Sequence, residues 1–260
     1  MDLIGKVAIV TGAGGAGCGR ADARRLAREG AAIIVSDIDE AGGRKTVGNI
    51  EAAGGRAAFF RADAGVEADV AALIDFAEKT FGGVDVIVNN ASAPYHADEP
   101  MGHWVKTVQV DLLGPMFAVL HGIEALRRRG GGAIVNVGST SALGHGRKHG
   151  HVPAYDAAKA GVIRLTTTLG WLGQRDNIRV NCLVPGWIAT PEVKAYYDSL
   201  SSVQRRELDV PQTLLSLDDI ADAVFQLATD ETLAGRIMVW WNGQPRRLIP
   251  AGDPGYAALE

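Results

Sequence analysis

The chain alternates between two hydrophobic patterns. Short, continuously apolar runs rich in β-branched residues end at glycine or polar residues, as buried strands of a parallel sheet do. Between several of these runs, apolar positions recur every three or four residues, which predicts amphipathic helices. About seven strands are expected, at residues 6–11, 31–36, 56–62, 84–88, 133–137, 178–183 and 236–241. This alternation predicts an α/β fold, a doubly wound parallel sheet with helices on both faces.

The helical pattern predicts helices at residues 20–30, 67–81, 101–128, 155–173, 192–207 and 217–229. Ser216 is the expected N-cap of the last helix. The polar helix at 192–207 lies within a segment, about 187–215, that we expect to act as a lid beside a substrate. Residues 242–260 hold three of the ten prolines and are predicted to be coil. Without a linker or an internal repeat, residues 1–260 are expected to form a single domain.

Composition narrows the class of protein. The chain has 260 residues, of which 47% are hydrophobic and 22% charged, which is typical of a globular protein with a substantial core. The formal net charge is -4. The densest basic run, Arg127–Arg129, ends a predicted helix, where positive charge favours the helix dipole. No nucleic-acid partner is therefore expected.

The two cysteines, Cys18 and Cys182, do not make a disulfide framework, and such usage is typical of a reducing compartment. No apolar run reaches membrane-spanning length, and the first residues lack the pattern of a signal peptide. We therefore expect a cytoplasmic protein with no membrane partner.

A glycine-rich segment follows the first predicted strand. Gly12, Gly14, Gly17 and Gly19 lie between that strand and the helix at 20–30. Glycines there allow a tight turn and close approach of a ligand, and the helix N-terminus presents N–H groups to a pyrophosphate. Asp37 ends the second strand, where a carboxylate accepts hydrogen bonds from an adenosine ribose. The segment predicts a dinucleotide site.

A second candidate site opens the helix at 155–173. Tyr155 and Lys159 are four positions apart, so both side chains lie on one face, one turn from each other. A phenol is a poor base at pH 7, but a nearby ammonium group favours the phenolate. The pair is suited to take a proton from an alcohol or to give one to a ketone oxygen. An isolated match of this kind also describes a surface lysine beside a half-buried tyrosine.

The motifs occur together and in order along nearly the whole chain: Thr11-Gly12 with Gly17 and Gly19, Asp63, Asn89-Asn90-Ala91, Ser139, Tyr155 with Lys159, and Pro185-Gly186 with Thr190. In this combination the sequence resembles the classical type of the short-chain dehydrogenase/reductase family. The resemblance implies a Rossmann fold and an oxidoreductase that transfers a hydride between NAD(H) and a secondary alcohol or ketone. The pocket loops suggest a mostly apolar or cyclic substrate. The alternative is a non-catalytic sensor or scaffold that binds the nucleotide.

The resemblance also implies residue roles. Tyr155 would be the acid/base, Lys159 would favour the phenolate and hold the nicotinamide ribose, and Ser139 would bind the substrate oxygen. Asp111 takes the fourth catalytic position. The expected cofactor-binding residues are Gly12, Gly14, Gly17, Gly19, Asp37, Asp63, Ala64, Asn90, Ala91, Tyr155, Lys159, Pro185, Gly186, Ile188 and Thr190.

The sequence departs from the family pattern in four places. The glycine loop has one extra residue between Gly12 and Gly17, and Ser92 replaces a glycine. The stretch between Ser139 and Tyr155 is about three residues longer than usual, with the excess in residues 144–151. Asp111 replaces the family's asparagine.

Asp111 carries a specific expectation. In the family, the main-chain carbonyl at this position lies at a helix kink and holds a water that links the lysine to solvent. Pro115, four residues later, has no N–H to bond that carbonyl, which predicts a kinked, free carbonyl here as well. The carboxylate adds negative charge near Lys159 and offsets its effect on the phenolate. We therefore expect an alkaline pH optimum for alcohol oxidation. In Asp111→Asn, the rising limb of the pH–rate profile should move to lower pH.

Cofactor preference and assembly follow from the same comparison. Asp37 repels a 2′-phosphate, position 38 is Ile and position 16 is Ala, so NAD is expected over NADP, with Arg20 as the one nearby cation.

A homotetramer, or a homodimer, is expected to pair through the helices at 101–128 and 155–173. The spare apolar residues there are Phe117, Val119, Leu120, Leu165, Leu169 and Leu172, with Trp240, Trp241 and the tail as a second contact.

Several residues keep two interpretations. His145, His149 and His151 suggest metal ligands, but their loose spacing in a glycine-rich stretch favours a mobile loop beside the substrate, and no metal is predicted. Cys18 begins a helix, which lowers a thiol pKa and would allow redox sensitivity, but the favoured interpretation is a small residue that fits the loop. Trp240 and Trp241 suit strand core and subunit contact better than a ligand platform. Further pocket-lining candidates are Tyr95, His96, Leu143, Trp187, Tyr196 and Tyr197.

Overall fold

One eight-stranded sheet runs through the computed structural model, which describes residues 1–94, 102–143, 153–250 and 252. Seven strands pair in parallel in the order β3-β2-β1-β4-β5-β6-β7. They are β1 (Val7–Thr11), β2 (Ala32–Asp37), β3 (Arg56–Arg61), β4 (Val86–Asn89), β5 (Gly132–Val137), β6 (Ile178–Pro185) and β7 (Ile237–Trp240). The doubly wound parallel sheet expected from the sequence is confirmed.

The eighth strand corrects one expectation. Residues Arg247–Leu248, predicted as coil, form β8, which pairs antiparallel with Val239 and Met238 of β7. The Arg236 guanidinium donates to the Ile249 carbonyl and holds this segment to β7. A two-residue strand beside prolines has too short a pattern to be recognised in the sequence.

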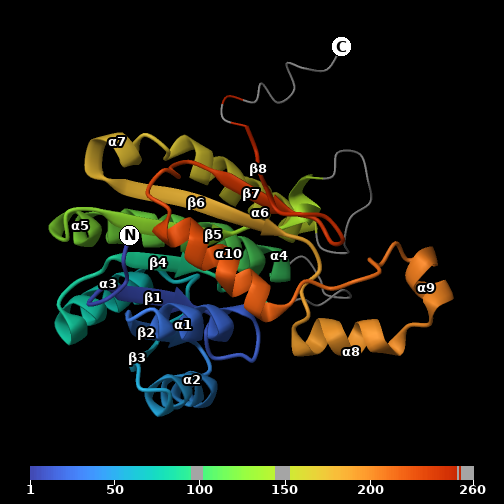
Figure 1. Ribbon diagram of the computed structural model, residues 1–260, viewed down its shortest axis with the longest axis horizontal. Coiled ribbons are helices and arrows are strands. Elements are labelled where there is room, and N and C mark those ends of the chain that lie inside the picture. Colours follow the sequence, from blue (N-terminus) through green and yellow to red (C-terminus); the bar gives the residue numbers. More distant parts are fainter. Residues whose placement is uncertain (95–101, 144–152, 251, 253–260) are drawn as a thin grey trace.

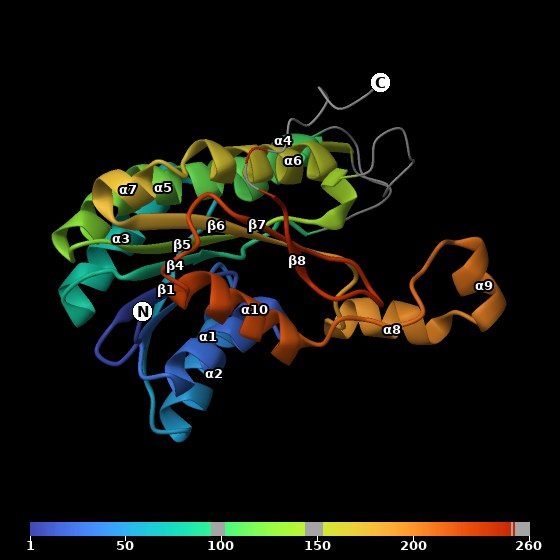
Figure 2. The ribbon, with the colours of Figure 1, turned by 45° about the horizontal axis from the view of Figure 1, so that its top comes forward.

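Helices cover both faces of the sheet (Figures 1 and 2). One face packs on α1 (Cys18–Arg28), α2 (Glu40–Ala52) and α10 (Leu217–Thr229). The other packs on α3 (Glu67–Phe81), α5 (Gly114–Arg128), α6 (Pro153–Thr168) and α7 (Leu172–Asp176). Strand residues alternate between the two cores, as Val10 and Ile9 do, so each face is apolar. No described helix is long and apolar enough to cross a membrane.

The helix α2 was not expected from the hydrophobic pattern. Its span contains Gly42, Gly43 and Gly48, and glycine disfavours helix. A Cβ at Gly43 would lie 2.1 Å from the Phe59 ring, so this glycine lets the helix pack directly on β3. The residues that weaken the helical pattern are here a packing requirement.

The predicted helix at 101–128 is three segments. They are α4 (Gly102–Val108), the π-helix η1 (Gln109–Leu113) and α5. The Gly114 N–H donates to the carbonyl of Gln109, five residues earlier, which is the π-helical pattern. Pro115, with no N–H of its own, follows directly. The expected departure from α geometry at residues 111–115 is therefore present as a widened turn.

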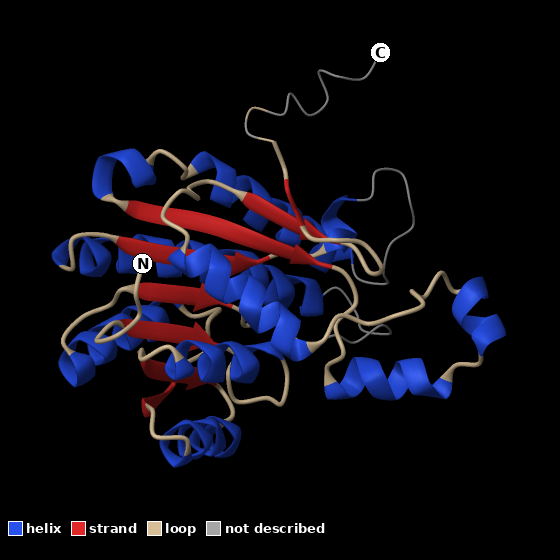
Figure 3. Cartoon of the chain, in the orientation of Figure 1, coloured by secondary structure: helices blue, strands red, loops and turns tan. Residues whose placement is uncertain are grey.

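Residues 191–207 form an arm. The single helix predicted at 192–207 is two helices, α8 (Pro191–Ser199) and α9 (Ser202–Glu207), because Ser201 starts the second with a capping box to Gln204. Neither helix has a buried residue, and both stand away from the sheet (Figures 1 and 3). The position suits a lid, whose movement stays a prediction.

Candidate active site

The cofactor-binding candidates gather where the parallel strands end. Gly12 follows β1 with φ +66°, and a Cβ there would lie 2.7 Å from Ala91 Cα. A Cβ at Gly19 would lie 2.3 Å from the Gly12 carbonyl oxygen. Only glycine permits this turn and this contact between the loop and α1. The backbone thereby leaves room for a pyrophosphate at the start of α1.

Hydrogen bonds fasten the ends of β1 and β4 to each other. Thr11 Oγ1 accepts from the N–H groups of Asn90 and Ala91, each at 3.1 Å. Asn90 Nδ2 donates to the carbonyls of Thr11 and Gly12 at 3.0 and 3.2 Å. Asn90 thus holds the first glycine turn in place, which explains why a polar residue is needed there.

The extra residue of the glycine loop is accommodated beside Asp37. Asp37 Oδ2 accepts from the Gly14 N–H at 2.7 Å, and its Oδ1 accepts from the Asp39 N–H at 2.9 Å. Arg20 donates to the Gly14 carbonyl and, at 2.9 Å, to Thr46 Oγ1. Gly14 is therefore held from both sides, and Arg20 is engaged in shaping the loop.

A cleft of about 590 Å³ lies over these strand ends. Eight predicted cofactor-binding residues line it: Gly12, Gly17, Asp37, Asp63, Ala64, Asn90, Ala91 and Thr190. Gly14 and Gly19 shape the loop from behind. Pro185, Gly186 and Ile188, at and after the end of β6, are not among the lining residues, so their cofactor contacts stay a prediction. Ser92 and Lys106 also line the cleft, and the sequence did not indicate either.

The residues present fit a dinucleotide. Gly12, Gly14 and Gly19 have no room for a side chain, and Asp37 faces the cleft beside the uncharged Ile38. A carboxylate with one hydrogen bond on each oxygen still has acceptor capacity for ribose hydroxyls. Gly12, Gly17 and Asp37 are thus suited to hold the pyrophosphate and the adenosine ribose.

Asp63 has a cation as its partner. Lys106 Nζ of α4 and the Gly65 N–H both donate to its carboxylate. Burial favours the neutral acid, but Lys106 and Gly65 together hold the pKa of Asp63 below its usual range. Asp63 is therefore a charged acceptor at the cleft wall, among the expected cofactor-binding residues.

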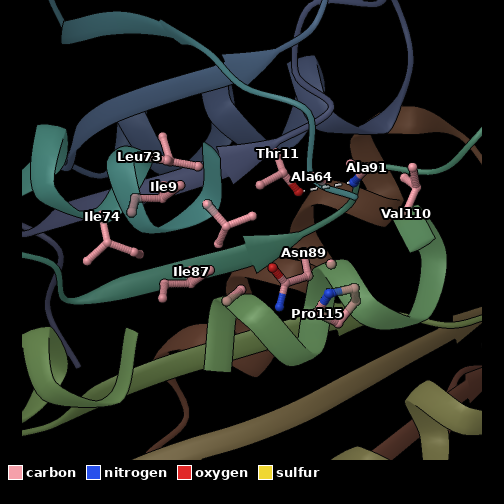
Figure 4. A pocket seen from close by; sticks show the side chains of 13 residues that line it. Ile9, Thr11, Ala64, Leu73, Ile74, Ile87, Asn89, Ala91, Val110 and Pro115 are labelled. Atoms are coloured by element: carbon pink, nitrogen blue, oxygen red, sulfur yellow. Dashed lines mark hydrogen bonds between the residues drawn. The ribbon is translucent and has the colours of Figure 1, made fainter. Parts of the chain in front are cut away.

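Beneath the cleft floor lies a small void of about 10 Å³ (Figure 4). Thr11, Ala64, Ala91 and Val110 line both this void and the cleft, and isoleucines of β1 and β4 lie deeper. The void has space for about one water molecule at most and its lining is mainly apolar, so it is a packing defect and not a ligand site.

The catalytic candidates come from the other half of the sheet. Ser139 follows β5, and its Oγ accepts from the Ser141 N–H at 3.2 Å. The 3-10 turn η2 (Thr140–Leu143) packs beside α6, which carries Tyr155 and Lys159. Lys159 Nζ lies 5.4 Å from the centre of the Tyr155 ring and donates to the Val137 carbonyl at 3.0 Å. The helix spacing places the pair as predicted.

Asp111 contacts this pair with its side chain. Asp111 Oδ1 lies 3.0 Å from Lys159 Nζ, and both side chains are buried. Ser92 Oγ donates to Oδ1 at 2.6 Å, and the Ala93 N–H donates to Oδ2 at 2.9 Å. The sequence placed the role of Asp111 mainly on its main-chain carbonyl. The expected negative charge near Lys159 is confirmed, as a direct ion pair.

The ion pair fixes the charge of Lys159. Burial disfavours an ammonium, but the attraction of Asp111, and then of Tyr155, raises the pKa of Lys159 above its usual value. Lys159 is therefore fully charged at neutral pH.

The expectation of a lowered thiol pKa at Cys18 is wrong. Burial and the neighbouring Asp22 raise the pKa of Cys18 to about 12. The thiol is neutral at physiological pH, which favours the interpretation of a small residue that fits the loop.

The lid-side candidates Trp187, Tyr196 and Tyr197 are not among the residues that line the cofactor cleft. Trp187 and Tyr196 stack with ring centres 6.2 Å apart, while Tyr197 donates to the Gln212 carbonyl at 2.6 Å. Leu143 packs on the core beside α6. Tyr95, His96, His145, His149 and His151 lie outside the described residues. Within the described residues, no group of three or more His, Cys, Asp or Glu side chains is arranged to hold a metal ion.

These features define a class of protein. The model of the short chain dehydrogenase family matches residues 6–200, and the chain belongs to this family. The fold agrees: a crystal structure of a short-chain dehydrogenase/reductase from Burkholderia xenovorans superposes with a TM-score of 0.83 at 32% identity, covering 93% of this chain and 97% of that one. The chain is thus an oxidoreductase of this family.

Two relatives are similar over most of their length. Cis-4-hydroxycyclohexanecarboxylate dehydrogenase of Sinomonas cyclohexanicum is 35% identical over 260 residues, 98% of this chain and 97% of the relative. L-rhamnose 1-dehydrogenase (NAD(P)(+)) of Azotobacter vinelandii is 38% identical over 239 residues, 88% and 92% of the two chains. Both names describe dehydrogenases of hydroxyl groups.

Proposed function

We propose that this protein is an NAD(H)-dependent dehydrogenase of secondary alcohols, working reversibly with the corresponding ketones. The observation that carries the proposal is the buried Lys159 ammonium beside the Tyr155 ring, on the helix that packs against the turn after Ser139. A charged lysine beside a phenol is the arrangement that proton exchange with an alcohol needs. A sensor without catalysis has no need of it.

Each residue has a defined task. Ser139 donates to the substrate oxygen and orients it toward Tyr155. The Tyr155 phenolate takes the hydroxyl proton as the carbon gives up its hydride, and Lys159 stabilises the phenolate. Bound nicotinamide supplies the hydride acceptor. In the reverse direction, Tyr155 returns the proton to the ketone oxygen.

NAD is the preferred form of the cofactor in this proposal. Asp37 faces the cleft and would repel a 2′-phosphate, while Arg20, the cation that weakened the argument, is bound to Thr46 and Gly14. One relative is named for both NAD and NADP, so the preference rests on these contacts.

Ring alcohols are the substrate class that we favour. One relative is named for a cyclohexane that carries a hydroxyl and a carboxylate. In this chain the stacked Trp187 and Tyr196 present a flat apolar surface at the base of the arm. A saturated ring packs well against such a surface.

We further propose a homo-oligomer that pairs through α4, α5 and α6. Trp104, Val105, Leu113 and Ala157 line an apolar groove of about 670 Å³ between α4 and α6, and Leu120 of α5 is 61% exposed. Two residues expected there are not spare: Val119 and Leu172 belong to the core. A monomer in light scattering at micromolar concentration would contradict this assembly.

The test is a panel of cyclic and open-chain secondary alcohols with NAD and NADP, followed by the absorbance of the reduced nicotinamide. We expect turnover of ring alcohols with NAD, and loss of at least about 100-fold in Tyr155→Phe. Binding of NADH without turnover of any alcohol or ketone would instead support the non-catalytic alternative.

A further inference from the structure

Two departures from the family pattern, Ser92 and Asp111, contact each other. They are 19 positions apart in sequence, and Ser92 Oγ donates to Asp111 Oδ1 at 2.6 Å. One lies in the loop after β4 and the other in the π-helical turn. A serine that replaces glycine thus supplies a hydrogen bond to the carboxylate that replaces an amide.

The Lys159 ammonium is sealed from solvent, with 3% of the residue exposed. Within the described part of the chain it contacts two oxygen acceptors, the Val137 carbonyl and the Asp111 carboxylate. A carbonyl oxygen has no proton to pass on, whereas a carboxylate can accept a proton on one oxygen and release it again. Asp111 is therefore the neighbour through which a proton can leave Lys159.

Asp111 is surrounded by donors. The Lys159 ammonium, the Ser92 hydroxyl and the Ala93 N–H all point at it, and none of its own surface is exposed. An acceptor-only group suits three donors, so the site selects the ionised carboxylate. An asparagine would give one acceptor oxygen and an amide that needs an acceptor in return.

Ser92 connects this buried pair to the cleft. Its residue is exposed and lines the cofactor cleft, while its hydroxyl holds Asp111. A hydroxyl both donates and accepts, so it can take a proton from one side while it releases its own on the other. The contacts form a continuous line from Lys159 through Asp111 and Ser92 to the cleft.

We propose that Asp111 and Ser92 form a side-chain proton route from Lys159 to the cofactor cleft. This inference rests on the proposed dehydrogenase function. It replaces the water at the main-chain carbonyl that the family resemblance implies.

The proton balance of the route is closed. During alcohol oxidation, Tyr155 takes the substrate's hydroxyl proton, and the C–H electron pair leaves as hydride to the nicotinamide. Lys159 gives one N–H proton to Asp111 and is restored by the proton from Tyr155. Asp111 passes its proton to Ser92, whose own proton goes to water in the cleft. One proton is released for each hydride, and the route itself involves no oxidation or reduction.

Among the residues that the structure describes, the other titratable groups facing Lys159 do not supply an alternative charge. Cys182 of β6 faces Lys159, but burial raises its thiol pKa to about 12, so it stays neutral. Tyr155 lies on the substrate side of Lys159. The described part of the loop after β4 offers Ser92 and the Ala93 N–H, and neither is charged.

The first test compares proton release with hydride transfer in one turnover. The holoenzyme is mixed with NAD and alcohol in weak buffer that contains a pH indicator. In the parent protein, indicator change and NADH formation should coincide. In Ser92→Ala, the rate of proton release should be at least about tenfold below the rate of hydride transfer. Imidazole should remove the lag, and Ser92→Thr, which keeps a hydroxyl, should restore the parent behaviour.

The second test needs no turnover. In cofactor-free protein, the ionisation of Tyr155 is read from the ultraviolet difference between each variant and its Tyr155→Phe counterpart. Asp111→Asn removes the negative charge and should move the midpoint to lower pH, together with the rising limb of alcohol oxidation. Ser92→Ala leaves the carboxylate in place, so its midpoint should stay within about 0.3 of the parent.

The outcomes separate the two proposals. Hydride transfer in the parent with no proton lag in Ser92→Ala would overturn the route and leave the dehydrogenase intact. An unmoved midpoint in Asp111→Asn would also overturn it, because the carboxylate would then not be coupled to the catalytic pair. Absence of hydride transfer with every alcohol would overturn the dehydrogenase, and the route with it.

Discussion

Asp111 and Asp22 are both fully buried, yet their surroundings are opposite. Asp111 receives a cation from α6 and two hydrogen-bond donors from the loop after β4. Neither oxygen of Asp22, in α1, has a hydrogen-bond partner in the described part of the chain. Burial alone raises the pKa of Asp22 to about 8.

The two aspartates show that burial by itself does not give a carboxyl group a function. A carboxyl group that is removed from water and has no partner becomes neutral, and its burial lowers the free energy of unfolding. A carboxylate given a cation and donors keeps its charge and acts on the groups around it. Equal burial therefore says nothing about the role of an acidic residue until its partners are named.

The largest expected effect comes from removing each carboxyl in turn. Asp111→Ala leaves the Lys159 ammonium buried without its counter-charge, and we expect a loss of about 3–5 kcal/mol in the free energy of unfolding. Asp22→Ala strands no charge and removes a carboxyl that the folded state keeps protonated at pH 7, so its free energy of unfolding should not fall below that of the parent. Urea unfolding at pH 7 measures both. Equal losses in the two variants would break the comparison.

The second prediction concerns the pH dependence that Asp22 imposes. Below about pH 4 the carboxyl is protonated in both folded and unfolded states. Between there and its folded pKa of about 8, the unfolded state ionises while the folded state keeps its proton, so stability falls as pH rises. Asp22→Asn removes this loss. The variant should gain stability over the parent by up to about 1.4 kcal/mol for each pH unit in that window.

Unfolding curves at several pH values from acid to mild alkali test this slope. A constant difference between Asp22→Asn and the parent would show that Asp22 is ionised in the folded protein.

Asp37 is an intermediate case, half-buried and held by two backbone N–H groups. Asp37→Ala removes the ribose acceptor, and we expect kcat/KM with NAD to fall about 10–100-fold while that with NADP changes much less. Asp39→Asn, at a neighbouring exposed carboxylate that also lines the cleft, is the matched control and should change either value less than about threefold. Equal effects of the two substitutions would remove Asp37 from cofactor selection.

The smallest effect links Asp22 to its neighbour one turn away. Burial, and then Asp22, raise the pKa of Cys18. In Asp22→Asn the alkylation of Cys18 by iodoacetamide at pH 9 should increase, but by less than about tenfold, since burial is the larger cause. Mass spectrometry with Cys18→Ser as the control measures the rate. Rapid modification of the parent at pH 7 would contradict the raised pKa.

The sequence predicted what depends on local pattern. Each parallel strand is a continuous apolar run, and the glycine loop, Asp37, Ser139 and the Tyr155–Lys159 spacing are local motifs. The two-residue β8 and the glycine-containing α2 were missed because packing, not propensity, decides them: Gly43 is required by Phe59.

The missed contacts of the site join distant segments. Lys106 reaches Asp63 across 43 positions, and Ser92 reaches Asp111 across 19. No spacing rule connects such residues, because their approach depends on strand order and on the widened turn. In the sequence, Ser92 and Asp111 stand out only as two separate departures from a family pattern. The structure shows that their side chains are hydrogen-bonded to each other.

The π-helical turn at Gln109–Leu113 also determines how far α5 is rotated about the helix axis relative to α4. Successive residues of an α-helix are rotated by about 100° about its axis, and a π turn takes up one extra residue. Everything before the turn is therefore rotated relative to everything after it. Asp111 points at Lys159 while Val105 and Leu120, on either side, remain exposed. If the chain were one residue shorter between Val105 and Leu120, helix rotation could keep the contact of Asp111 with Lys159, or it could keep Val105 and Leu120 on the outer surface. It could not keep both.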